Sequence, residues 1–189
     1  MASPLLALLL LGIACTHAPP ETRPRYEGHV ESIGETIERY AEIAQTVVRV
    51  SDTEPPPPGF TRRQGAAILL GMAIGESGLA RDADVGPCYR GANGTNKRCD
   101  SGRSVSMWQV WAPVPFEWRG EMVDQERLFN DRELAARIAY QRIRVSLTAC
   151  AKLAPAYRLS MYGSGECYEM EGAAVRWAFI QKLLAAVRL

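Results

Sequence analysis

The sequence has very little histidine and almost no net charge. Its 189 residues include only His17 and His29, both close to the N-terminus. Catalysis by a histidine in the body of the chain is therefore excluded. The 22 Lys and Arg residues against 21 Asp and Glu give a net charge of +1, so no basic field favours nucleic-acid binding through counterion release. We expect no nucleic-acid partner, and chemistry that relies on carboxylates, hydroxyls or the backbone.

Long hydrophobic runs are also scarce. The apolar run at 5–14 is too short to span a bilayer, but it suits the hydrophobic region of a secretory signal. Ala14 stands directly before Cys15, as in the cleavage motif of bacterial lipoproteins. We expect residues 1–14 to be a signal peptide and Cys15 to be lipidated, with ordinary cleavage after Ala18 as the rival. Either route exports the protein, which we place in the periplasm, in contact with a membrane only through that anchor.

Closely spaced cysteine pairs of the C-x-x-C type are absent, which argues against a zinc site, and we expect no metal and no cofactor. Once Cys15 is set aside, an even number of cysteines remains, which in an exported protein favours two disulfides. Three pairings are possible. The shortest loops favour Cys88 with Cys99 and Cys150 with Cys167. Four free thiols in a cytosolic protein would conflict with the leader.

Helical periodicity dominates the rest of the chain. Residues 15–30 are proline-rich and predict an exposed tether, and 31–189 form one domain. Helices are expected over 31–50, from about 64 to 77, over 131–150, over 154–162 and over 171–188. Ser32 and Thr61 each precede a Glu or Gln by three residues, as in a capping box. In the last helix we expect Val175, Phe179, Leu183 and Val187 to face inward. No convincing sheet is evident, so the fold class is mainly α.

A polar stretch at 81–103 lacks periodicity and predicts a long loop pinned by a disulfide, of the kind that walls a cleft. Directly before it, Glu76 follows an uncharged segment at 65–75, and Gly78 is placed to end that helix. The helix C-terminus and the apolar surroundings both disfavour ionisation, so we expect a raised pKa for Glu76. A protonated carboxyl group suits general acid catalysis. The alternative is a solvated residue at a helix end.

Three short pieces together resemble a known family. They are Gly75-Glu76-Ser77-Gly78, the stretch from Ser104 to Val110, and the stretch from Leu159 to Gly165. Their order and spacing over 61–189 resemble the soluble lytic transglycosylase domain of the lysozyme-like superfamily, which cleaves peptidoglycan. The chain departs from the family at Ser106, where Gly is usual, and at Gly163, where Asn is usual.

The resemblance implies a lysozyme-like domain with Glu76 as the catalytic acid. It implies that Ser77, Ser106, Gln109 and Tyr162 bind substrate or orient Glu76. For Gln109 and Tyr162 the alternative is a satisfied polar group in the core, and for Ser77 a hydroxyl at a helix end. Three tryptophans could stack on sugars, although packing is the favoured role: Trp108, Trp111 and Trp118.

A glycosidase normally needs two carboxylates, and the sequence nominates no clear second one. The aspartates Asp82, Asp84, Asp100 and Asp124 lie in polar stretches and are expected to be solvated. This absence fits the transglycosylase scheme that the resemblance implies. In it Glu76 acts as acid and then as base, and the product is a 1,6-anhydro sugar. The expected partner is the peptidoglycan glycan strand, cleaved by a monomer. The alternatives are a lysozyme that uses water and a silent wall-binding lipoprotein.

Overall fold

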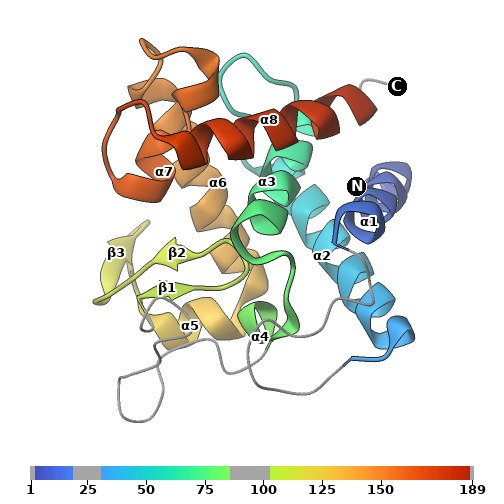
Figure 1. The fold of residues 1–189 in the computed structure, drawn as a ribbon. Helices are drawn as coiled ribbons and strands as arrows, with labels where there is room; N and C mark the ends of the chain where they lie inside the picture. The colour runs from blue at the N-terminus through green and yellow to red at the C-terminus, as the bar shows by residue number, and fades with distance from the viewer. Residues whose placement is uncertain (1–2, 19–30, 86–102, 188–189) are drawn as a thin grey trace.

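The structure, a computed structural model, describes residues 3–18, 31–85 and 103–187. It is mainly helical, as expected, with two small antiparallel hairpins on one side (Figure 1). The elements are, in chain order, α1 (Pro4–His17), α2 (Ile33–Thr53), α3 (Arg62–Ser77), α4 (Arg81–Asp84), β1 (Ser104–Val105), β2 (Val110–Trp111), β3 (Phe116–Trp118), β4 (Glu121–Val123), α5 (Gln125–Asn130), α6 (Arg132–Ala149), the 3-10 turn η2 (Pro155–Tyr157), α7 (Ser160–Ser164) and α8 (Glu171–Ala186).

Helix α3 is the centre of the core. Every residue from Gly65 to Ile74 is buried, because the segment is apolar on all sides and must be covered all round. Helices α2, α6 and α8 pack against it, and α8 crosses over it in Figure 1. The helix begins at the capping box of Thr61 and Gln64 and ends at Gly78, whose φ of 61° is a left-handed conformation that glycine adopts without strain.

Four of the expected helices are confirmed as α2, α3, α6 and α8, with ends within three residues of the expected positions. The capping box of Ser32 and Glu35 starts α2, and Asp131 caps α6. The expected helix over 154–162 is instead divided into η2 and α7, because Leu159 takes up a non-helical backbone between them. Three features were missed. Residues 81–84 form α4 and residues 125–130 form α5. The stretch from 104 to 123 forms two hairpins whose strands of two or three residues are too short for a periodic pattern.

The inward face of α8 differs from the expected one. Val175 is 65% exposed, so its expected inward position is wrong. The buried stripe contains Ile180, Leu183 and Val187, and continuing it by four residues toward the N-terminus gives Arg176. Ala173 and Trp177 are also buried, so a charged residue lies at the edge of this apolar stripe.

A disulfide joins Cys150 to Cys167 and connects the end of α6 with the loop after α7, as expected. Cys88 and Cys99 lie outside the described residues. Helix α1 packs on α2 with Leu10 and Ala14 fully buried, and Cys15 lies in its last turn with a free thiol. Among the described residues no helix has both the length and the apolar character to span a membrane.

Close contact between α3 and α8 generates a stability prediction. A Cβ on Gly71 would lie 2.9 Å from Cγ1 of Ile180 and 3.1 Å from Cδ1 of Leu183. Gly71→Ala is therefore expected to lower the free energy of unfolding by about 1–3 kcal/mol through overpacking. The matched control is Gly75→Ala one turn later, where the nearest atom is 3.7 Å away and helix propensity favours Ala. Urea denaturation checks both, and equal effects would contradict the packing argument.

Candidate active site

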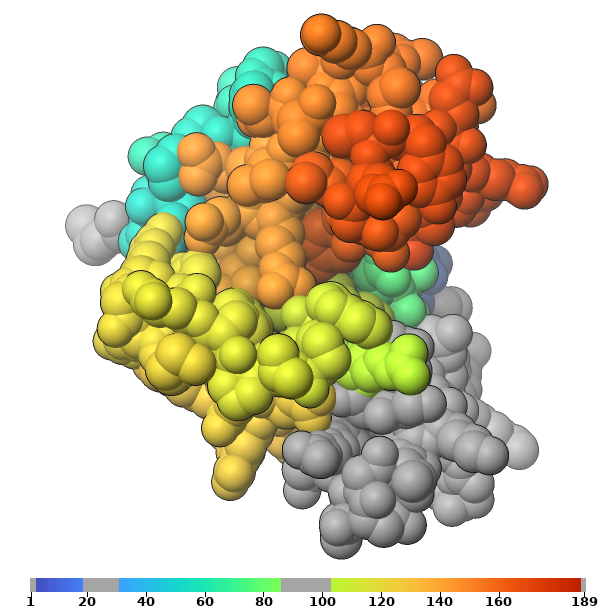
Figure 2. All heavy atoms as spheres, turned by 90° about the vertical axis from the view of Figure 1, so that its left-hand side faces the viewer, coloured from blue at the N-terminus to red at the C-terminus, as the bar shows by residue number. Residues whose placement is uncertain are grey.

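A cleft of about 1000 Å³ lies between the two hairpins and the segment from α6 to α8. Figure 2 shows this face, with the hairpins in yellow and yellow-green below the orange segment of α6 and α7 and a hollow between them. The end of α3 contributes Glu76. The other lining residues are Ser104, Gln109, Trp111, Phe116, Glu117, Trp118, Ile138, Gln141, Arg142, Val145, the α7 residues 161–165, and Arg176.

Glu76 is positioned by the end of α3 and by an ion pair. Its Oε1 lies 2.7 Å from Nε of Arg176, and Nη2 of Arg176 donates to Oε2 at 3.3 Å. The carboxyl side chain is only 12% exposed. The helix C-terminus disfavours the carboxylate, as the sequence suggests, but the guanidinium favours it. The sequence analysis missed Arg176. The signal that could have found it is its charge on the apolar stripe of α8.

Gln109 lies in the tight turn between β1 and β2. Its backbone N–H donates to the carbonyl of Ser106 at 3.0 Å, and its side-chain Nε2 donates to the same oxygen at 2.9 Å. Both residues have positive φ, 68° at Ser106 and 50° at Gln109. The turn therefore requires the left-handed conformation at the position where the family resemblance has Gly. Ser106 is buried and does not line the cleft. Its Oγ accepts a hydrogen bond from the backbone N–H of Trp108 at 3.3 Å, so it acts here by shaping the turn.

Tyr162 connects α7 to the same turn. Its hydroxyl donates to the carbonyl of Trp108 at 2.6 Å, while its backbone N–H donates to Oγ of Ser146 at 3.2 Å. Burial raises the pKa of Tyr162 far above its usual value. The Glu76 carboxylate adds to this increase, and Arg142 and Arg176 oppose it. Tyr162 is thus a neutral hydrogen-bonding group close to Glu76.

Two further residues from the sequence analysis lie away from the cleft. Ser77 is buried and its hydroxyl donates to the carbonyl of Ala73 at 3.0 Å, which matches the alternative of a helix-end hydroxyl. Trp108 is fully buried and its indole N–H donates to the carbonyl of Leu69. The favoured packing role is confirmed for Trp108. Trp111 and Trp118 instead line the cleft, and Trp111 is 48% exposed.

The expectation of solvated aspartates is wrong for Asp82 and Asp84, which are both buried. Asp84 accepts hydrogen bonds from Arg132 at 2.8 and 2.9 Å and from Arg39 at 3.5 Å. These arginines stand more than 40 residues away in the sequence, so a local polar pattern could not reveal them. Asp124 is exposed and caps α5, and Asp100 lies outside the described residues. The second carboxylate that lines the cleft is Glu117, which the sequence analysis did not nominate.

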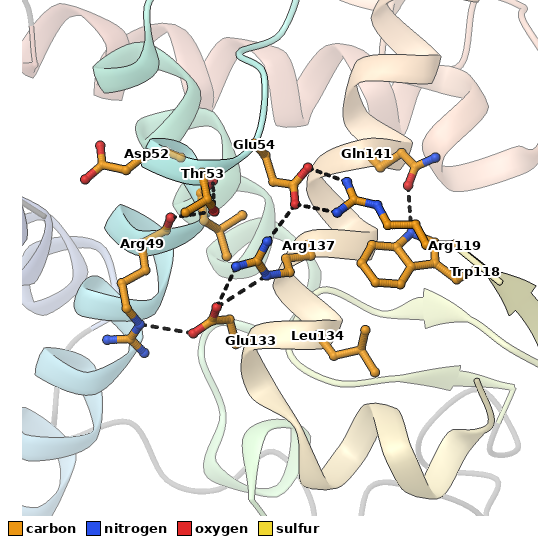
Figure 3. Close-up of polar contacts among 12 residues, drawn as sticks. Arg49, Asp52, Thr53, Glu54, Trp118, Arg119, Glu133, Leu134, Arg137 and Gln141 are labelled. Carbon is orange, nitrogen blue, oxygen red and sulfur yellow. Dashed lines mark hydrogen bonds and ion pairs between the residues drawn. The ribbon is translucent and has the colours of Figure 1, made fainter. Parts of the chain in front are cut away.

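A network of charges fixes the wall of the cleft formed by β3 and β4 (Figure 3). Glu54, at the end of α2, accepts from Nη2 of Arg119 at 2.6 Å and from Nη1 of Arg137 at 2.8 Å. Arg119 lies over the ring of Trp118 at 4.5 Å. The indole N–H of Trp118 donates to Oε1 of Gln141 at 2.7 Å. The hairpin and its tryptophan are therefore connected to both α2 and α6.

Within the ranges that the structure describes, no group of three His, Cys, Asp or Glu side chains is arranged to bind a metal ion. The polar groups that line the cleft include the Glu76–Arg176 pair, two amides, a phenol, the guanidinium of Arg142 and a second carboxylate. Together with exposed aromatic rings, they can donate a proton and hydrogen-bond a polar, sugar-like ligand.

No protein-family model, no curated protein and no solved structure matches this chain. The residues of the cleft therefore carry the functional interpretation by themselves.

Burial alone would raise the pKa of Glu54, but the hydrogen bonds and charges of Arg119 and Arg137 outweigh it and lower that pKa below 4.5. Glu54→Gln is expected to lower the free energy of unfolding at pH 7 by about 1–3 kcal/mol, because a buried charge-assisted pair is lost. A lowered folded-state pKa means that this contribution is complete above the unfolded value and disappears as the pH falls through the folded one. The difference from wild type should therefore shrink below pH 4.5.

The matched control is Glu133→Gln in the same network. Glu133 pairs with Arg137 and Arg49, but its side chain is 35% exposed against 4% for Glu54. An exposed pair contributes less than about 1 kcal/mol. Urea denaturation as a function of pH checks both variants, and a Glu54→Gln effect that stays constant down to pH 3 would rule out the ionic origin.

Proposed function

We propose that this chain is a peptidoglycan lytic transglycosylase with a lysozyme-like fold. The observation that carries the proposal is the convergence of Glu76, Gln109 and Tyr162 on one cleft, although they lie on α3, the β1–β2 turn and α7. These are three of the residues that the family resemblance assigns to the site. The exposed ring of Trp111 and the half-buried ring of Trp118 line the same cleft and support a sugar ligand.

In the proposed reaction Glu76 first donates its proton to the glycosidic oxygen between N-acetylmuramic acid and N-acetylglucosamine. The bond from that oxygen to C1 of the muramyl residue breaks, and the 2-acetamido group stabilises the positive charge at C1. The Glu76 carboxylate then takes the proton from the muramyl 6-hydroxyl as its oxygen bonds to C1. The product is a 1,6-anhydro sugar, and no water, metal or cofactor takes part.

Glu117 favours a second candidate function. It is a carboxylate on β3 that lines the same cleft as Glu76, and a water-using lysozyme needs a second carboxylate as nucleophile or base. The two functions differ in product, because hydrolysis adds a water molecule that the intramolecular reaction does not. A silent wall-binding lipoprotein on the same fold remains the alternative from another class.

We further propose that the protein is exported to the periplasm and acts as a monomer anchored by a lipid. The leader at 1–14 and the disulfide between Cys150 and Cys167 support export.

Processing of the leader can be measured directly. We expect the mature chain to begin at Cys15 and to carry a lipid on that residue, as shown by the mass of its N-terminal peptide after expression in a bacterium with a lipoprotein pathway. Cys15→Ser should release the protein from the membrane fraction. An unmodified chain beginning at Pro19 would show ordinary cleavage after Ala18 instead.

Digestion of purified peptidoglycan tests the reaction. Glu76→Gln keeps the size of the side chain and removes its proton, so release of muropeptides should fall by about 100-fold or more. Glu117→Gln is the control and should retain most of the activity. Mass analysis should find products about 18 Da lighter than hydrolytic ones.

Other outcomes would select the alternatives. Reducing-end products that disappear in Glu117→Gln would identify a water-using lysozyme. Sedimentation with the wall, without any release by the wild-type protein, would leave a binding module.

A further inference from the structure

The pairing of Glu76 with Arg176 conflicts with the first step of the proposed reaction. Two nitrogens of the guanidinium face the two carboxyl oxygens, at 2.7 and 3.3 Å. This two-point contact stabilises the carboxylate form. The carboxylate is the form needed for the second step, in which Glu76 accepts a proton. The first step needs the protonated form, so the arrangement suits the base and opposes the acid.

Among the described residues, the other titratable groups that face this site do not remove the conflict. Tyr162 of α7 is neutral, because its pKa is raised mainly by burial. Arg142 of α6 donates to the carbonyl of Trp111 at 3.0 Å, and burial lowers its pKa. Glu117 of β3 lines the same cleft. Among these groups, Arg176 is the one with a direct ionic contact to Glu76.

The remaining nitrogen of Arg176 suggests how the pair is released. Nη1 is buried and has no hydrogen-bond partner among the described residues. It lies against Gly163 of α7, where a Cβ would come within 3.3 Å of it. A buried N–H group without a partner is destabilising, because it has lost its hydrogen bonds to water and gained none in return. The guanidinium is thus incompletely satisfied at the wall of a cleft, where an oxygen of a bound glycan can offer it a better set of contacts.

We propose that Arg176 is a positioning residue that holds Glu76 as a carboxylate in the empty cleft, and that a bound glycan takes over the guanidinium so that Glu76 can carry its proton. The proposal deepens the proposed function and rests on it. In this scheme Glu76 acts as an acid only when substrate is bound. After Glu76 has given up its proton, Arg176 pairs with the carboxylate again.

The direct test is a carbon-13 NMR titration of the Glu76 carboxyl group in the full chain without substrate. Glu76→Gln identifies the signal. Removal of the neighbouring cation in Arg176→Met is expected to move the titration midpoint to higher pH by about one to three units. Arg176→Lys keeps the charge and should restore most of the wild-type midpoint. An unchanged midpoint in Arg176→Met would overturn the proposal. If Arg176→Met does not fold, Arg176→Gln removes the same positive charge with a polar side chain and is compared with Arg176→Lys in the same way.

Kinetics on soluble glycan fragments test the release of the pair. The pH profile of kcat/KM reports the free enzyme and that of kcat reports the complex. In Arg176→Met the alkaline limb of kcat/KM should move to higher pH by the shift that NMR measures, while the alkaline limb of kcat stays in place. Equal movement of both limbs would overturn the proposed transfer of Arg176 to the glycan, because the Glu76–Arg176 pair would then persist in the complex. If no form of the protein cleaves the glycan, the proposed function fails, and the NMR titration without substrate still decides whether Arg176 controls Glu76.

Discussion

The cleft depends on the complete burial of α3. A helix that is apolar on all sides has no face to offer to water, so α2, α6 and α8 must surround it. Glu76 follows directly after this segment, at the position where the surrounding helices no longer bury α3 completely. A carboxylate that remains largely buried there needs a partner of opposite charge. The close packing of α8 on α3 supplies it, because the stripe that meets α3 continues into Arg176.

The two walls of the cleft are held by different forces. On the side of α3 and α8 the contacts are apolar and close. The β3–β4 hairpin is too small to bury much apolar surface, and a two-stranded hairpin by itself is marginally stable. Its position is instead fixed by the ion pairs of Glu54 with Arg119 and Arg137. The tryptophan on this wall is therefore placed by electrostatics, whereas Glu76 is placed by the packing of α3 and α8 together with its ion pair to Arg176.

The chemistry of the cleft depends on residues that, taken one at a time in the sequence, are weak evidence for a functional site. Gln109 and Tyr162 are both tied to the β1–β2 turn, the first through the carbonyl of Ser106 and the second through that of Trp108. The turn thus fixes an amide and a phenol relative to each other. Glu76 and Arg176 face them from α3 and α8. A polar ligand that enters meets hydrogen-bonding groups whose positions are set before it binds, which reduces the cost of orienting it.

The sequence by itself determined the long helices of the core and most of their ends, because caps and apolar periodicity act over only a few residues. The capping boxes at Ser32 and Thr61, the terminating Gly78, the Cys150–Cys167 pair and the exceptional position of Glu76 could all be read from local pattern. Only the tertiary structure decided which charges meet. The partners of Asp84 and Glu54 and the pairing of Glu76 with Arg176 join segments 45 to 100 residues apart. The local sequence around a carboxylate does not show whether it is solvated or buried, because its burial depends on elements that folding brings together.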